Sequence, residues 1–60
     1  MPKLRILAQA LLSDENGIST ESYDALMALV EDTDSDLYRI LQWNTDATDG
    51  RFYLREGIVL

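Results

Sequence analysis

Residues 19–44 carry two amphipathic patterns on either side of a short acidic segment, and this stretch constrains the fold most strongly. On each side apolar residues recur at spacings of three and four, which is the period of a helix with one buried face. The acidic segment between them, residues 32–36, combines residue types that cap helices with negative charge. We therefore expect two helices that meet at residues 32–36 and pack their apolar faces together.

The helix before the acidic segment is predicted to begin after Ser19 and to end near Glu31 or Asp32. Ser19 is a favourable N-cap, and Ile18 and Tyr23 lie around it at the spacing of a hydrophobic staple. The buried face of this helix is expected to contain four side chains, with Leu29 at the edge: Tyr23, Leu26, Met27 and Val30.

The helix after the acidic segment is predicted to be capped by Thr33 or Ser35 and to end near Asn44. Its buried stripe is formed by Leu37, Ile40 and Leu41. Tyr38 and Trp43 are five residues apart on this helix, so their side chains point about 140° apart. One of the two is therefore expected at the surface, where aromatic side chains often mark partner contacts. A Trp43 side chain that lies under the C-terminal hairpin is the alternative.

A third helix is predicted over residues 3–13, with Pro2 in its first turn. Its apolar face contains Leu4, Leu7, Ala8, Leu11 and Leu12, and is widened by Ile6 and Ala10. This helix is expected to end within residues 13–17, because Asn16 or Gly17 can take the left-handed conformation that closes a helix.

Residues 49–60 are predicted to form a small hairpin. Asp49-Gly50 is a turn signal, residues 51–55 have the composition of a strand, and Glu56-Gly57 offers a second turn before Ile58-Val59-Leu60. Because the last three side chains are apolar, we expect them to be covered by the helices or by a second copy of the chain. The second case predicts a homodimer formed through Ile58–Leu60.

These elements predict a mainly α (α+β) fold in a single small domain over residues 1–60, with three short helices in a compact bundle and a C-terminal β-hairpin. The order of three helices followed by a hairpin resembles that of a winged helix. The expected core is formed by Leu4, Leu7, Leu11, Leu26, Met27, Val30, Leu37, Ile40 and Leu41, closed by Phe52, Leu54 and Ile58.

Sixty residues without cysteine leave helix packing and self-association as the means of stabilising so small a core. The apolar content of 47% is typical of a folded domain rather than of a disordered acidic tail. No apolar run approaches the roughly 20 residues that span a bilayer, and residues 1–12 lack a clear signal-peptide cleavage site. We expect a cytoplasmic protein without membrane association.

The net charge of −6 is unevenly distributed, because no Lys or Arg occurs between Ile6 and Tyr38. A chain with this charge is repelled by nucleic acids and anionic membranes, and a protein partner with a basic surface is favoured instead. The candidate partner-binding residues are the acids of residues 19–36 and the two aromatic residues that follow: Glu21, Asp24, Glu31, Asp32, Asp34, Asp36, Tyr38 and Trp43.

The residue types needed for common catalytic and metal sites are missing. The chain has no His and no Cys, and therefore lacks the usual general base and the best nucleophile. A calcium-binding EF-hand loop that began at Asp32 would need Gly and Glu where Leu37 and Trp43 stand. We therefore expect no catalytic, cofactor-binding or metal-ligating residues, and a protein that is not an enzyme.

The leading functional hypothesis is a small non-catalytic protein-interaction module, a regulator or inhibitor that docks on a basic surface. In size and sign of charge the chain resembles the small acidic proteins of phages and plasmids that imitate nucleic acid. The alternative interpretation is that the carboxylates only solvate a helix face and keep the protein soluble. The alternative function is a winged-helix-like DNA-binding regulator that acts as a dimer, with Arg39, Gln42 and Asn44 facing the groove and Arg51 and Arg55 near phosphates.

Overall fold

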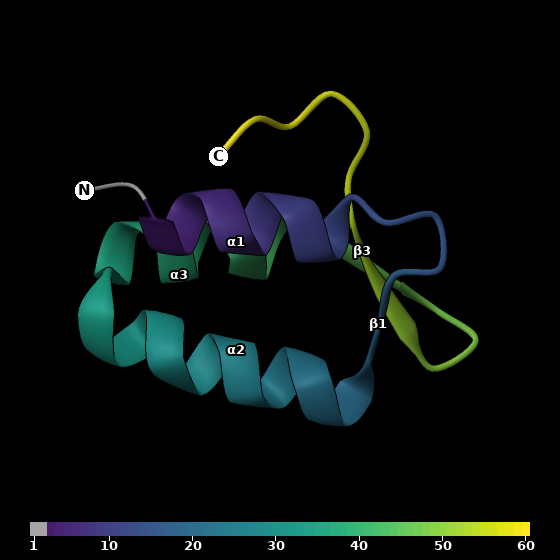
Figure 1. Ribbon diagram of the computed structural model, residues 1–60, viewed down its shortest axis with the longest axis horizontal. Coiled ribbons are helices and arrows are strands. Elements are labelled where there is room, and N and C mark those ends of the chain that lie inside the picture. Colours follow the sequence, from purple (N-terminus) through teal and green to yellow (C-terminus); the bar gives the residue numbers. More distant parts are fainter. Residues whose placement is uncertain (1–2) are drawn as a thin grey trace.

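The computed structural model describes residues 3–60, so the predicted role of Pro2 lies outside the described residues. The fold is α+β, as predicted, with three helices and a three-stranded antiparallel sheet (Figure 1). The elements in chain order are α1 (Lys3–Leu12), β1 (Ile18–Ser19), α2 (Thr20–Thr33), α3 (Ser35–Asn44), β2 (Thr45–Thr48) and β3 (Arg51–Leu54).

The sheet is ordered β1-β3-β2, so the short strand between α1 and α2 pairs with the last strand of the chain. In this pairing Ile18 is opposite Phe52 and Ser19 is opposite Arg51. Along the chain, three helices are followed by a hairpin, so the predicted winged-helix-like order of elements is confirmed. Strand β1 adds a third strand that the sequence did not predict. The aromatic rings of Tyr23 and Phe52 stack with centroids 4.1 Å apart and fasten α2 to the sheet.

The hairpin is formed by different segments from those predicted. The strand expected at residues 51–55 is present, but its hairpin partner is Thr45–Thr48 rather than residues 58–60. Asp49 and Gly50 join the two strands with φ values of 53° and 75°. Two successive residues with positive φ favour a two-residue hairpin loop, which pairs the segments on either side of it. Residues 58–60 form no strand.

The C-terminal segment instead returns alongside α1 (Figure 1). The side-chain amide of Gln9 holds it in place. Its Nε2 donates to the carbonyl oxygen of Ile58 at 3.3 Å, and its Oε1 accepts from the backbone N–H of Leu60 at 2.7 Å. Leu60 packs against the core, while Val59 is 89% exposed. The expectation that the helices cover these residues is therefore met for Leu60 but not for Val59.

The core confirms the predictions for α2 and α3 better than those for α1. Its buried apolar side chains are Ala8, Leu12, Ile18, Leu26, Val30, Leu37 and Leu41. Leu7 and Leu11, expected in the core, are 48% and 38% exposed, so this part of the prediction was wrong. Apolar residues cover so much of the circumference of α1 that their period does not identify the buried side. The structure turns Ala8 inward, and its small side chain allows close packing.

The helix ends follow the predicted capping chemistry with one shift. Ser19 caps α2, and its Oγ accepts from the backbone N–H of Ser22 at 3.2 Å. The cap of α3 is Asp34 rather than Thr33 or Ser35, because α2 continues to Thr33 and a single residue separates the two helices. The described helices are all too short or too polar to cross a membrane.

Candidate protein-interaction surface

The exposed side of α2 carries a row of carboxylates, which we call the acidic row: Glu21, Asp24, Glu31 and Asp32. All four residues are exposed, whereas Leu26 and Val30 on the opposite side of the helix are buried. Spacings of three, ten and eleven residues from Glu21 place the four carboxylates on one side of an α-helix. Ala25 and Ala28 lie between them and are also exposed, so the row is not covered by large neighbouring side chains.

The acidic row is not neutralised within the described part of the chain, because the ion pairs there involve other carboxylates. Arg5 Nε lies 3.0 Å from Asp34 Oδ2, and Arg55 Nη2 lies 3.0 Å from Asp46 Oδ1. The guanidinium group of Arg51 donates to the carbonyl oxygens of Asn16 and Gly17, at 2.9 and 3.3 Å. Arg5, Arg51 and Arg55 therefore bind groups outside α2.

Asp34 differs from the other predicted partner-binding acids because the fold uses both of its carboxylate oxygens. Oδ1 accepts from the backbone N–H of Leu37 at 3.1 Å, and Arg5 donates to both oxygens. The hydrogen bond from Arg5, followed by that from Leu37, lowers the pKa of Asp34 below its ordinary value. Asp34 is half-buried and joins α2, α3 and α1, whereas Asp36 in the first turn of α3 is exposed.

The two aromatic residues predicted for partner binding do not form one patch. Trp43 is 72% exposed, whereas Tyr38 is half-buried and packs against the core. The prediction that one of them lies at the surface is confirmed, and the alternative of Trp43 under the hairpin was wrong. Asn44, expected to face outward, is half-buried, and its Nδ2 donates to the carbonyl oxygen of Ile40 at 2.8 Å.

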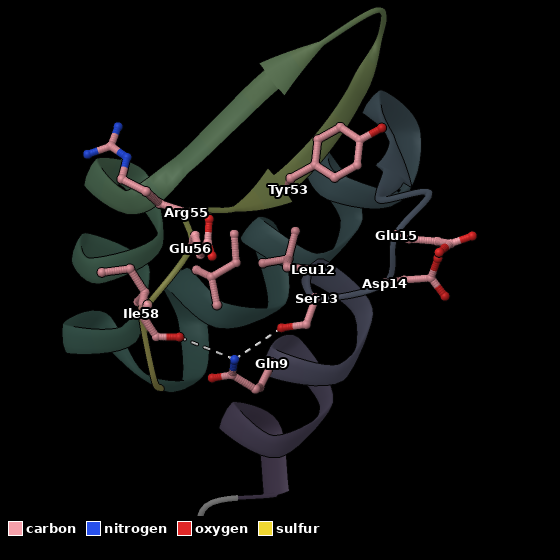
Figure 2. Close-up of a pocket in the computed structure, with 11 residues that line it drawn as sticks. Gln9, Leu12, Ser13, Asp14, Glu15, Tyr53, Arg55, Glu56 and Ile58 are labelled. Carbon is pink, nitrogen blue, oxygen red and sulfur yellow. Dashed lines mark hydrogen bonds between the residues drawn. The ribbon is translucent and has the colours of Figure 1, made fainter.

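A hollow of about 350 Å³ lies between the end of α1 and the C-terminal segment (Figure 2). Gln9 Nε2 donates to Ser13 Oγ at 3.0 Å and to the carbonyl oxygen of Ile58, as the dashed lines show. Asp14 and Glu15 at its rim point away from these groups (Figure 2). The hollow therefore holds a structural hydrogen-bond network. Among residues 3–60 no three carboxylates gather closely enough to share a metal ion.

Comparisons with protein-family models, with curated proteins and with solved structures found no match for this chain.

A second exposed surface, on α1, was not recognised from the sequence. Four neighbouring apolar side chains on this helix are exposed, and we call them the α1 outer face: Ile6, Leu7, Ala10 and Leu11. A groove of about 390 Å³ runs along one edge of this face, with Val59 and Leu60 on its other side. The signal was present in the sequence, because a helix that is apolar nearly all round needs partners on more than one side.

Proposed function

We propose that this protein is a small non-catalytic interaction module, a regulator or inhibitor that docks its acidic row on a basic surface of a larger protein or complex. The observation that supports this proposal is the separation of charges within the fold. Arg5 and Arg55 are paired with Asp34 and Asp46, and the four carboxylates of the acidic row are left for a partner.

The shape of α2 suits such a role. A helix of 14 residues is about 21 Å long, and its backbone holds the four carboxylates in fixed positions. Complementary charge of this kind speeds association and selects among partners more than it raises final affinity. A line of fixed negative charges also resembles a nucleic-acid backbone, so a nucleic-acid-binding protein is the partner class that best fits the proposal.

Two variants with equal changes in charge test the proposal. In the row variant Asp24→Asn and Glu31→Gln are combined. The control variant combines Asp49→Asn and Glu56→Gln, which are exposed carboxylates outside α2 and away from α1. Each set removes two negative charges, from one Asp and one Glu residue.

The immobilised wild-type protein is expected to retain specific proteins from a lysate of its native host at low salt and to release them as salt is raised. The control variant should retain the same proteins, identified by mass spectrometry, and the row variant should lose them. Equal loss from both variants would assign the binding to net charge alone. Equal retention by both would remove the acidic row from the interaction.

A DNA-binding regulator that acts as a dimer is the second candidate, and β1 favours it because it completes the winged-helix-like order. In this candidate α3 faces the DNA groove with Arg39 and Gln42, but Asp36 on the same helix opposes phosphates. A gel-shift assay with duplex DNA at moderate salt separates the two candidates. Retardation supports the DNA-binding regulator, and free duplex at micromolar protein supports the interaction module.

A further inference from the structure

We infer that the α1 outer face is the contact through which two copies of this chain associate, with their α1 helices antiparallel about a twofold axis. This interface is separate from the acidic row on α2 and from the function proposed for it. It also differs from pairing of the C-terminal segments as strands, because residues 58–60 form no strand and Gln9 occupies their backbone groups.

The apolar character of the α1 outer face is the first support. Ile6 is 64% exposed, Leu7 48% and Leu11 38%, and these side chains are neighbours on one helix. Val59, at 89% exposure, stands across the adjoining groove. Contiguous apolar side chains of this kind on a small protein mark interaction sites more often than scattered ones do. Burial against a second apolar surface would remove them from water.

The charges at the two ends of α1 are the second support, and they favour a second copy of this chain as the partner of the α1 outer face. Lys3 lies in the first turn of α1, and Asp14 and Glu15 follow its last turn, which contains no basic residue. Within one chain both placements oppose the helix dipole, which favours anions at the N-terminus and cations at the C-terminus. In an antiparallel pair, Lys3 of each copy lies beside the carboxylates of the other, so both placements become favourable.

The C-terminal end of α1 offers room for this contact. A hollow of about 350 Å³ there is lined by Ala10, Leu11 and Asp14, among other residues, and Arg51 lies in the same hollow. The guanidinium N–H groups of Arg51 donate to the carbonyls of Asn16 and Gly17. The carboxylates of Asp14 and Glu15, together with the carbonyl end of α1, outweigh the single positive charge of Arg51.

Helix periodicity fixes the register. Positions 3, 7, 10 and 14 alternate spacings of four and three, which is the pattern of a helix-pairing seam. With Lys3 opposite Asp14 of the second copy, Leu7 lies opposite Ala10 of that copy and Ile6 is level with its Leu11. Ala10 is small, so the two helices can approach closely at the centre of the contact.

The size of the face sets the expected affinity. Stable complexes bury about 800 Å² on each partner, which is a large part of the 4207 Å² of accessible surface here. A helix of ten residues offers less than this area. We therefore expect a reversible dimer that dissociates in the micromolar range.

Sedimentation equilibrium over a concentration series tests the inference. The mass of the wild-type protein should rise from 6.8 kDa toward twice that value. Leu7→Glu should weaken dimerisation by about a hundredfold, since it buries an unpaired charge. Leu29→Glu is the matched control, because Leu29 is 52% exposed on α2, and it should leave dimerisation unchanged. Circular dichroism checks that both variants remain folded.

Cross-linking tests the antiparallel arrangement independently of stability. The chain has no Cys, so Lys3→Cys and Asp14→Cys each introduce a single thiol. Mixed in equal amounts and mildly oxidised, the two variants should form the mixed disulfide in preference to either self-linked dimer, because positions 3 and 14 face each other only in the antiparallel pair. Ala25→Cys, at an exposed alanine of α2, should remain monomeric. A wild-type protein that stays at 6.8 kDa up to millimolar concentration would overturn the inference, as would equal effects of the α1 substitutions and their α2 controls.

Discussion

At the scale of single residues, Asp34 is the acid whose structural role is clearest. It caps α3 through the N–H of Leu37 and forms an ion pair with Arg5 on α1. Its backbone N–H also donates to the carbonyl oxygen of Val30 at 2.7 Å, which closes α2. One residue therefore fixes the junction of three helices. This explains why its carboxylate is less available to a partner than those of the acidic row.

Asp34 makes stability depend on pH. Because Arg5 and the N–H of Leu37 lower its pKa in the folded state, its contribution is fully present above the unfolded pKa, about 4, and is lost as pH falls through the folded pKa. Asp34→Asn keeps an oxygen for the cap but loses the charge. We expect the melting temperature of the variant to lie below that of the wild type at pH 6. The difference between the two melting temperatures should narrow toward pH 2.5. A gap that is constant with pH would contradict this account.

The sequence predicted a cap in this segment but placed it at Thr33 or Ser35, whereas the structure has it at Asp34. Thr33, Asp34 and Ser35 all have side chains that cap helices. Asp34 is the single residue between α2 and α3, and it also accepts from Arg5, which is 29 residues away along the chain. Local patterns therefore predicted that a cap lies in this segment, but they contained neither the exact end of α2 nor this tertiary contact.

At the scale of elements, the junction of α1 with the sheet depends on Gly17. Its φ is 62°, and a Cβ built there would lie 2.5 Å from the carbonyl oxygen of Phe52 and 2.9 Å from the ring of Tyr53. Gly57 also has positive φ, 87°, but a Cβ there meets nothing within 4 Å. The two glycines therefore separate the effect of backbone strain from the effect of a steric clash.

Gly17→Ala is expected to lower the free energy of unfolding by about 2–4 kcal/mol, because strain and overpacking add. Gly57→Ala should lower it by about 1 kcal/mol, since only the backbone conformation is unfavourable. Urea denaturation of the two variants provides the measurement. Equal effects would mean that β1 does not hold Gly17 closely against β3.

The acidic row offers a second matched pair at this scale. Glu21 lies in the first turn of α2 and Glu31 near its end, and both are exposed. The helix dipole favours the first carboxylate and opposes the second. We expect Glu21→Gln to destabilise and Glu31→Gln to stabilise the protein, each by about 0.3–1 kcal/mol at low salt. Thermal melts should show that both changes in melting temperature shrink toward zero in high salt. Changes of the same sign for the two variants would contradict the explanation.

The elements differ in how far the sequence predicted them. The two helices of residues 19–44 were predicted within two residues of their observed ends, because each has a distinct apolar face. The strand Thr45–Thr48 was missed, since Thr, Asp and Ala give a weak strand signal and the pairing with Arg51–Leu54 supplies the rest. β1 has only two residues and no pattern of its own; it exists because β3 lies beside it.

At the scale of the whole molecule, α1 and α2 each turn one face to the shared core and the other outward. The outward face of α1 is apolar and that of α2 is acidic, so the two surfaces suit different partners. A twofold pair formed through α1 would leave two acidic rows exposed. Such a pair could bind a positively charged surface through both rows at once, which raises apparent affinity without any new type of contact.

Anion-exchange chromatography tests this combination with variants that leave the charge unchanged. The wild-type protein, loaded above its dimerisation range, should elute at higher salt than Leu7→Gln, because only the dimer presents two rows to the matrix. Leu29→Gln should elute with the wild type, since Leu29 lies on α2 away from the α1 outer face. If a monomeric Leu7→Gln elutes with the dimer, the second row does not reach the matrix. The acidic rows would then lie on opposite sides of the pair and bind partners singly.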